Sequence, residues 1–571
     1  MSAQTGEEIP AAPASLRLGD RLRFRVARFL TDPNPIWTRE LRQSTRLART
    51  PFILMAVTIV VTLLIAAIGG SVSEREPSDV VGSLLFHTFF SIGFFVVAWV
   101  GPALAANAIA SEREGRTWEA IVLTGLGPKV IARGKFLAAF SDVAAYIVML
   151  APVGALPFLF GGVHWLEVVI GFLYLFIMAA LSVAFGLALS SKMASSRGAI
   201  LVTLLLSVPL SGMLYSGAGP GLSVAVHELW TRVAPGHPIW LPIAYVRGDP
   251  GLAYFLMLFV VPAIVFGLPG WLLYEATIAN LTEANDDRSS GLKRWFTTAS
   301  VVLVATGVVT LFAVPTARTV IEVGITEAVV WLWFLGFATV MFTGEPLGPT
   351  RRVVARWNQN RVGPLGRYFG PGLISTLGLL LVVGILGFAT TTLVALVRYA
   401  ALIKVSPSYT PDLDTQLVHF VAYALGFFVF TVGLGAWLRS RSNNVAGSRI
   451  VFIVIVVGVA IVPWIAAAVL GLASRSDEAI LLAAPSPFYA FMLLGRRGDS
   501  VWLAGLAASI GWAALGLGLL AAGRKKARQI IRAYDDHFAR AEAALAAEEA
   551  AAAAPGVAVA NGDAAVVEAE A

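Results

Sequence analysis

Long apolar runs recur along most of this chain, and they constrain its fold more than any other feature. We count about twelve runs that approach or exceed the ~20 residues a helix needs to cross a bilayer. Hydrophobic residues make up 57% of the chain and charged residues only 13%, whereas soluble domains carry about 25% charged residues. Such a chain must be solvated by lipid. The expected spans are 52–70, 82–109, 136–160, 166–190, 198–215, 252–277, 298–316, 327–343, 371–396, 415–437, 450–473 and 501–522.

The fold class predicted from these runs is an all-α polytopic membrane protein with about twelve transmembrane helices. Lys and Arg residues indicate the orientation. With the N-terminus placed in the cytoplasm, 33 of the 42 Lys and Arg residues fall in cytoplasmic segments, as the positive-inside rule requires. We therefore expect both termini in the cytoplasm. The net positive charge reports orientation, so the expected partner is the lipid bilayer, and no nucleic acid is expected.

Residue types that carry chemistry are sparse. The chain has no cysteine, which excludes disulfides, thiol chemistry and Cys-based metal sites. Its six histidines are scattered along the chain, and no two lie at the spacing of metal ligands. We therefore expect no metal site and no catalytic residue in this chain.

The spans fall into two sets of six, and short sequence matches suggest that the sets are related. Arg247-Gly248-Asp249 recurs as Arg497-Gly498-Asp499, an offset of 250 residues, and two shorter matches occur in the same order. Because six is even, duplication would give a parallel repeat, although biased composition also produces chance matches. The expected organisation is a cytoplasmic segment 1–50, a first six-helix unit 51–280, a linker 281–297, a degenerate second six-helix unit 298–523, and a tail 524–571, helical and then disordered beyond Pro555.

One polar loop, residues 111–135, joins the second and third expected spans and reads SEREGRTWEAIVLTGLGPKVIARGK. Its Gly134-Lys135 pair does not form a phosphate loop, because Phe136 stands where that motif needs a hydroxyl residue. The nearest candidate glycine, Gly127, lies seven residues before Gly134, where the motif requires five. We therefore expect no nucleotide to be bound or hydrolysed by this chain.

A short helix is predicted at the centre of loop 111–135. Ser111 and Glu114 fit a capping box, which would start a helix. Trp118, Ile121 and Val122 follow at i, i+3 and i+4 and would form one apolar face. The expected result is a short amphipathic helix between two spans, which another protein could push.

The end of this helix is also marked in the sequence. Gly125 and Gly127 would end it, and Pro128 suits the first turn of the next helix. That next helix would run through Lys135 into the third span. A load on the short helix would then pass directly to a membrane span.

Loop 111–135 resembles the loop of ABC type-2 export permeases, with the form E-[RK]-E-x-[GR]-T-x-E-x-L-[LM]-x-[TS]-x-[LP]-[ST]-x-x-x-[IL]-x-x-G-K. Residues 34–43, NPIWTRELRQ, are similar to the N-P-[IV]-x-x-[RK]-E-[LM]-R-Q opening of some of these permeases. Two departures are Val122, where Leu is commoner, and Gly127-Pro128, where a small hydroxyl residue usually stands. The residues of loop 111–135 that fall on the pattern are Glu112, Glu114, Thr117, Glu119, Leu123, Thr124, Ile131, Gly134 and Lys135.

The resemblance implies a permease subunit of the bacterial inner membrane that exports its substrate with energy from a separate ABC ATPase, present in two copies. ATP and Mg would be bound by that partner, and this chain would bind no cofactor. A homodimer stays open. The residues implied to couple to the ATPase are Glu112, Arg113, Glu114, Gly115, Thr117, Trp118, Glu119, Leu123, Thr124, Pro128, Gly134 and Lys135.

The segment before the first span predicts an amphipathic helix at the cytoplasmic interface. Asn34 is a good N-cap and Pro35 a good first residue. Arginines at helical spacing would meet anionic lipid or acidic residues of the ATPase, and a simple positive-inside anchor is an equal alternative. The residues assigned to this interfacial helix are Asn34, Pro35, Trp37, Arg39, Glu40 and Arg42.

The loop at 343–367 takes the equivalent place in the second half. It is basic and lacks the acidic pattern, so we expect a degenerate coupling loop that contacts the second copy of the ATPase.

Two other functions stay open. One is a twelve-helix secondary carrier of the major facilitator type, whose signature Glu112–Arg116 matches imperfectly. A lack of acidic residues in the middle of the expected spans argues against a proton-coupled carrier. The other is a membrane scaffold without transport.

Overall fold

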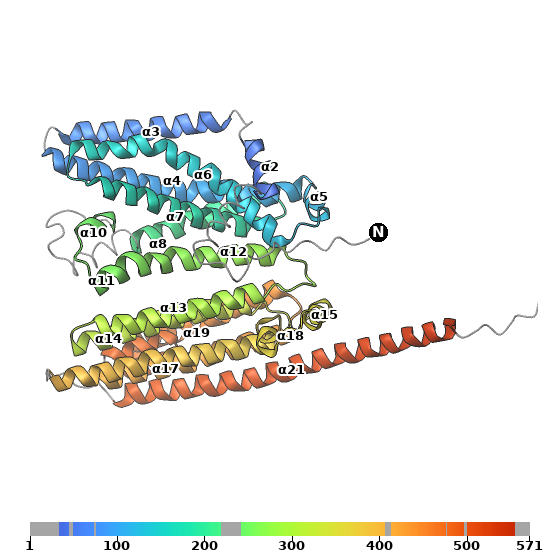
Figure 1. Cartoon of the computed structure of the whole chain (residues 1–571). Helices are drawn as coiled ribbons and strands as arrows, with labels where there is room; N and C mark the ends of the chain where they lie inside the picture. Colours follow the sequence, from blue (N-terminus) through green and yellow to red (C-terminus); the bar gives the residue numbers. More distant parts are fainter. Residues whose placement is uncertain are drawn as a thin grey trace, which may run out of the picture. The chain divides into compact units, whose positions relative to one another are not determined.

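The computed structural model describes residues 33–44, 49–73, 76–217, 241–405, 413–474, 477–495 and 499–553. Within these ranges the chain is almost entirely helical and has no β-strand (Figure 1). Among the described residues, eleven helices are long and apolar enough to cross a membrane. The prediction of an all-α polytopic membrane protein is therefore confirmed. The expected disorder beyond Pro555 and Arg497-Gly498 of the repeat lie outside the described residues.

Every expected span of the first half lies in a helix. The span predicted at 252–277 is interrupted by two π-helical segments, which widen the helix locally. The first of the six spans, α3, is a helix of 25 residues. The bounds are α3 Arg49–Ser73, α4 Ser78–Glu114, α6 Pro128–Phe160, α7 Trp165–Ser190, α8 Ser196–Ser216, α11 Leu252–Phe255, η2 Leu256–Val260, η3 Ala263–Gly267 and α12 Leu268–Leu281.

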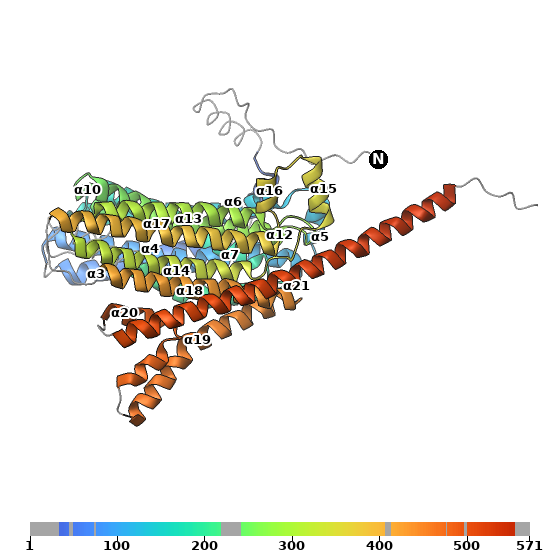
Figure 2. The same ribbon diagram turned by 90° about the horizontal axis from the view of Figure 1, so that it is seen from below.

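The spans of the second half are also helices, and two of them differ from the prediction. Helix α14 begins at Ala317, ten residues before the expected 327. Its first turns are polar and carry an Arg318–Glu322 ion pair, so the helix is longer than its apolar run. Helix α21 continues without a break from the last span into the tail (Figure 2). The bounds are α13 Ser290–Ala313, α14 Ala317–Phe342, α17 Leu373–Val405, α18 Leu413–Arg441, α19 Val445–Ser474 and α21 Asp499–Ala553.

Short helices connect or precede the spans. Helix α5 lies in the polar loop at 111–135, α15 and α16 begin in the polar loop at 343–367, and α2 precedes the first span. Their bounds are α2 Pro35–Ser44, α5 Trp118–Leu123, α10 Leu241–Arg247, α15 Arg351–Gln359, α16 Pro364–Phe369, η4 Asp477–Ala483, η5 Pro487–Phe491 and α20 Met492–Gly495.

The described residues group into two compact units that interleave along the chain. The first comprises 1–333, 349–371 and 382–421, and the second 334–348, 372–381 and 422–571. The predicted boundary at 281–297 between two six-helix units stays a prediction. Loop 111–135, α2 and α15 all belong to the first unit.

Helix α4 is the centre of the first unit and packs against α6, α7 and α8. Phe86 and Phe90 are fully buried in this core. A Cβ at Gly171 of α7 would lie 2.7 Å from the ring of Phe90, so only glycine allows α7 to approach so closely. Small residues at helix contacts are a general means of close packing in membranes.

The second unit uses the same device between α18 and α21. A Cβ at Gly433 would lie 2.1 Å from the carbonyl oxygen of Gly516. The two backbones therefore touch at this crossing. The last part of α21 then extends beyond α18 and α19 (Figure 2).

Candidate functional site

The predicted interfacial helix α2 is present and is fastened to the start of α6. The Asn34 Oδ1 atom accepts hydrogen bonds from the amides of Ile36 at 3.0 Å and Trp37 at 3.3 Å, which confirms the predicted N-cap. The same side chain donates from Nδ2 to the carbonyl of Val130 at 2.8 Å. One residue thus both starts α2 and binds it to α6, while Pro35 occupies the first helical position.

Gly134 allows α2 to lie directly on α6. A Cβ at this position would be 2.5 Å from Asn34 Oδ1 and 2.7 Å from the Cβ of Ile36. Farther along, Trp37 donates from its indole Nε1 to Ser141 Oγ at 3.1 Å. The glycine of the Gly134-Lys135 pair is therefore explained by the close contact with α2.

Four charged side chains form a compact cluster where α2, the end of α4 and the start of α6 meet. Lys135 Nζ lies 2.6 Å from Glu112 Oε1 and 3.0 Å from Glu40 Oε1. Arg39 lies 2.7 Å from both carboxylates. Lys135 is only 2% exposed, so its charge is almost fully removed from water and depends on these partners. We call Arg39, Glu40, Glu112 and Lys135 the charge cluster.

The charge cluster sets the ionisation of Glu40. Burial alone would raise the pKa of its carboxyl, but the charge of Lys135 and hydrogen bonds from Arg39 and Lys135 outweigh it. The pKa of Glu40 is therefore held below its usual value.

Arg39 binds two carboxylates of its own chain, and contact of the α2 arginines with lipid or an ATPase stays a prediction. Arg42 is exposed, as expected. The position of Glu112 could not be predicted from α2 alone, since it is brought to Glu40 by the packing of α4 and α6.

The predicted capping box is also wrong. Ser111 and Glu114 belong to the last turn of α4, which continues to Glu114, and Ser111 Oγ donates to the carbonyl of Asn107 at 2.6 Å. The chain turns at Gly115 and at Arg116, whose φ is +56°. Helix α5 starts only after Thr117. Helix α4 therefore extends one turn farther than its hydropathy suggests.

Glu114 instead connects two spans. Its Oε2 atom accepts a hydrogen bond from the amide of Ser196 at 2.9 Å, and Ser196 is the first residue of α8. A carboxylate at a helix N-terminus satisfies free N–H groups and is favoured by the helix dipole. The end of α4 is therefore tied to the start of α8.

Helix α5 has one buried face and one exposed face, but not as predicted. Ile121 is buried with Ile36 and Ile131 in a small apolar cluster, against which Trp118 packs. Val122, expected on the buried face, is 45% exposed. Helix α5 begins at Trp118, seven residues after the predicted cap at Ser111.

The exposed tip of α5 contains Glu119, Val122 and Leu123. Leu123 is 85% exposed, which is unusual for a leucine in a loop outside the expected spans. Thr124 ends the helix, and its hydroxyl donates to the carbonyl of Ile121 at 2.6 Å. Arg113 lies over the Trp118 ring at 5.5 Å on the α4 side. We call Glu119, Val122 and Leu123 the α5 tip.

The predicted break between α5 and α6 is confirmed. Gly125 has a φ of +73°, a conformation that favours glycine, and Pro128 is the first residue of α6. Helix α6 then carries Gly134 and Lys135 into the third span without interruption.

The second polar loop contains a helix that the sequence pattern did not reveal. Thr350 caps α15, and ion pairs hold α15 to the segment after α12: Arg352 with Glu283 at 2.6 Å and Arg356 with Asp286 at 3.2 Å. The sequence signal for α15 was Thr350, a residue that often caps helices, followed by the apolar Val353 and Trp357 at helical spacing. The predicted second coupling loop thus has a helical element, but its binding to an ATPase stays a prediction.

The expected lack of acidic residues in the middle of the spans is wrong. Glu327 lies ten residues inside α14, because that helix begins earlier than predicted. Its carboxylate faces Gly307 of α13, where a Cβ would be 2.8 Å from Oε2. Both carboxylate oxygens are buried and have no hydrogen-bond partner in the part of the chain that the structure describes. Glu167, near the start of α7, is also fully buried.

Comparison with models of protein families, with curated proteins and with solved structures gives no match to this chain.

Proposed function

We propose that this chain is the membrane-spanning permease subunit of an ABC transporter and exports its substrate with energy from a separate ATPase. The observation that carries the proposal is the setting of α5. Its tip is exposed, and its base rests on α2 and α6 through Ile36, Ile121 and Ile131. An element of this kind can receive a load from another protein and pass it on.

The contacts around α5 lead to three membrane spans. The charge cluster joins α2 to α4 and α6, and Glu114 joins α4 to α8. Because Lys135 is buried, separating it from its carboxylates would be costly, so α2, α4 and α6 would move together at this end. ATP-driven movement of a partner bound to the α5 tip would therefore shift the spans as a group.

ATP and Mg would be bound by the partner. Two copies of the ATPase would contact this chain, one at α5 and the other at α15. The expected location is the bacterial inner membrane, with the α5 end in the cytoplasm.

This proposal is tested by purifying the tagged full chain from the cells that encode it and identifying bound proteins by mass spectrometry. We expect a P-loop ATPase to be recovered with the wild type. Leu123→Asp and Glu119→Lys should each reduce its recovery by about tenfold, because both change the exposed tip without touching the charge cluster. Leu545→Asp, the same exchange at an exposed position of α21, should have no effect.

The proposal would be wrong if no ATPase accompanies the wild-type chain, or if the α5 variants retain it as well as Leu545→Asp does. Glu112 and Glu114 are unsuitable for this test, since both make contacts within the chain. Their replacement would disturb the fold whatever the partner.

A second candidate is a secondary carrier, which Glu327 favours. Ionisable residues within membrane helices often mark ion or proton pathways. In that case reconstituted chain would transport under an ion gradient without an ATPase, and Glu327→Gln would abolish this transport.

A further inference from the structure

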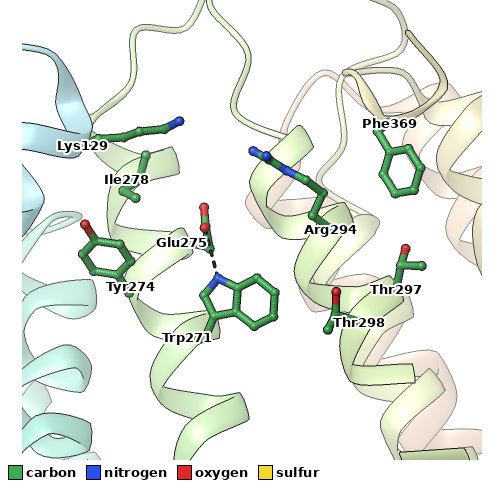
Figure 3. Close-up of a pocket in the computed structure, with 9 residues that line it drawn as sticks. All are labelled: Lys129, Trp271, Tyr274, Glu275, Ile278, Arg294, Thr297, Thr298 and Phe369. Atoms are coloured by element: carbon green, nitrogen blue, oxygen red, sulfur yellow. Dashed lines mark hydrogen bonds between the residues drawn. The ribbon is translucent and has the colours of Figure 1, made fainter. Parts of the chain in front are cut away.

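A cleft in the first compact unit lies away from the α5 tip and is not used in the function proposed above. Its volume is about 450 Å³, and it is lined by residues of α6, α12, α13 and α16 (Figure 3). All four elements come together near the connection between α12 and α13. The last residue of α12, Leu281, packs against the α5 base, so the cleft is at the same end of the helices as α5.

The mouth of this cleft is positively charged. Lys129 and Arg294 are both exposed there, and neither forms an ion pair with any described residue. Glu275 lies between them (Figure 3), where it accepts a hydrogen bond from Trp271 Nε1 at 3.1 Å. Arg133 lines an adjoining cavity. Two cations, Lys129 and Arg294, thus flank one carboxylate at the mouth, which leaves a net positive charge there.

The adjoining cavity is apolar. It has a volume of about 510 Å³, lies between α6, α7 and α12, and shares Trp271 and Tyr274 with the charged cleft. Its lining includes Leu181 and Phe266. At Gly267 a Cβ would meet no atom within 4 Å, so the absence of a side chain keeps this part of the cavity open.

The backbone beside the apolar cavity is irregular. Phe266 and Gly267 belong to the π-helical segment η3, and such segments in α-helices are frequently found at functional sites. Trp271 and Tyr274 lie one and two turns farther along, next to the charged mouth. Trp and Tyr are the aromatic residues that prefer the boundary between headgroups and acyl chains.

We propose that the two cavities together bind one anionic glycerophospholipid. Its phosphate would contact Lys129 and Arg294, and an acyl chain would occupy the apolar cavity beside Gly267. A charged mouth continuous with an apolar cavity fits an amphiphile better than a free anion. Basic pockets between membrane helices on the cytoplasmic side are known to hold lipid headgroups. The bound lipid would link α6, α7, α12 and α13.

The proposal is tested by native mass spectrometry of the full chain in neutral detergent, titrated with phosphatidylglycerol or phosphatidylcholine. We expect phosphatidylglycerol to bind more tightly. Removing two cation contacts in the double variant Lys129→Gln, Arg294→Gln should weaken its binding by about tenfold or more. Arg318→Gln, which changes an exposed arginine on α14, should leave binding unchanged.

A second variant tests the acyl-chain cavity with all cations in place. Gly267→Leu would fill the open space beside the helix and should also weaken phosphatidylglycerol binding, while inorganic phosphate should not compete. Equal binding of the two lipids, or unchanged binding in the double variant, would overturn the proposal. Full competition by inorganic phosphate with no effect of Gly267→Leu would assign the cleft to free phosphate instead.

Discussion

At the scale of single residues, the charge cluster is the most informative part of the molecule. Glu112 is distant in sequence from the adjacent pair Gly134-Lys135, yet all three contribute to one contact between α2, α4 and α6. The motif-like appearance of Gly134-Lys135 therefore has a structural cause within this chain. Glycine permits the approach of α2, and the buried lysine pairs with two carboxylates that it shares with Arg39.

Lys135→Met should destabilise the protein more than an ordinary surface exchange. It leaves Glu40 and Glu112 close together without their buried cation, and breaking a buried pair in this way costs about 3 kcal/mol. The thermal unfolding midpoint in detergent should fall clearly below that of the wild type. Lys526→Met, which removes an exposed lysine from α21, is the matched control. Equal midpoints for the two variants would mean that the cluster contributes little.

The cluster also predicts how stability depends on pH. The pKa of Glu40 is lowered from its usual 4.5 in the folded protein, so its contribution is fully present above about pH 4.5. The contribution is lost as the pH falls through the lowered value, because the carboxylate then takes up a proton. The difference in unfolding midpoint between wild type and Glu40→Gln should be constant from pH 7 to pH 5 and shrink at lower pH. A difference that grows on acidification would contradict this sign.

At the scale of elements, the helices themselves could be predicted and their contacts could not. Asn34, Pro35 and Pro128 mark helix starts through local chemistry, and all three predictions are confirmed. The start of α5 was misplaced, because Ser111 and Glu114 satisfy a local pattern while α4 continues past them. Pairs such as Glu114 with Ser196 depend on tertiary packing, which no local pattern contains.

Gly134→Ala should loosen α2 from α6. The added methyl group would lie 2.5 Å from Asn34 Oδ1, and overpacking of this kind costs about 1–3 kcal/mol. Trypsin should then cleave after Arg39 and Arg42 faster than in the wild type, which can be followed by mass spectrometry of the peptides that end at these two residues.

Gly127→Ala is the control for this experiment. Gly127 has a φ of −65° and no atom within 4 Å of an added Cβ, so alanine is tolerated there. Cleavage of Gly134→Ala at the rate of this control would show that α2 is not held by close packing.

At the scale of the whole molecule, the sequence predicts the class of protein well. Apolar runs of sufficient length identify each membrane helix, and all twelve expected spans lie in helices. The start of α14 and the end of α4 were less predictable, because polar turns extend both helices beyond their apolar parts. That extension is why Glu327 was expected at the edge of a span and lies inside one.

Within the first compact unit, the charge cluster and the α5 tip are adjacent and have different roles. The charge cluster and the apolar contacts of Ile121 hold α5 in place, and the α5 tip remains exposed to a partner. Glu112, Glu114, Gly134 and Lys135 position the loop through contacts within the chain. Glu119, Val122 and Leu123 are exposed, and the proposed function assigns partner binding to them.

The central claim is that the α5 tip binds an ATPase, and site-specific cross-linking tests it most directly. The chain contains no cysteine, so Leu123→Cys introduces a single thiol at the most exposed apolar position of the tip. A maleimide photocross-linker attached there and activated in native membranes should join this chain to a P-loop ATPase. Leu545→Cys on α21 should not. Cross-links from position 123 only to lipid, or to proteins without a nucleotide site, would contradict the proposed function.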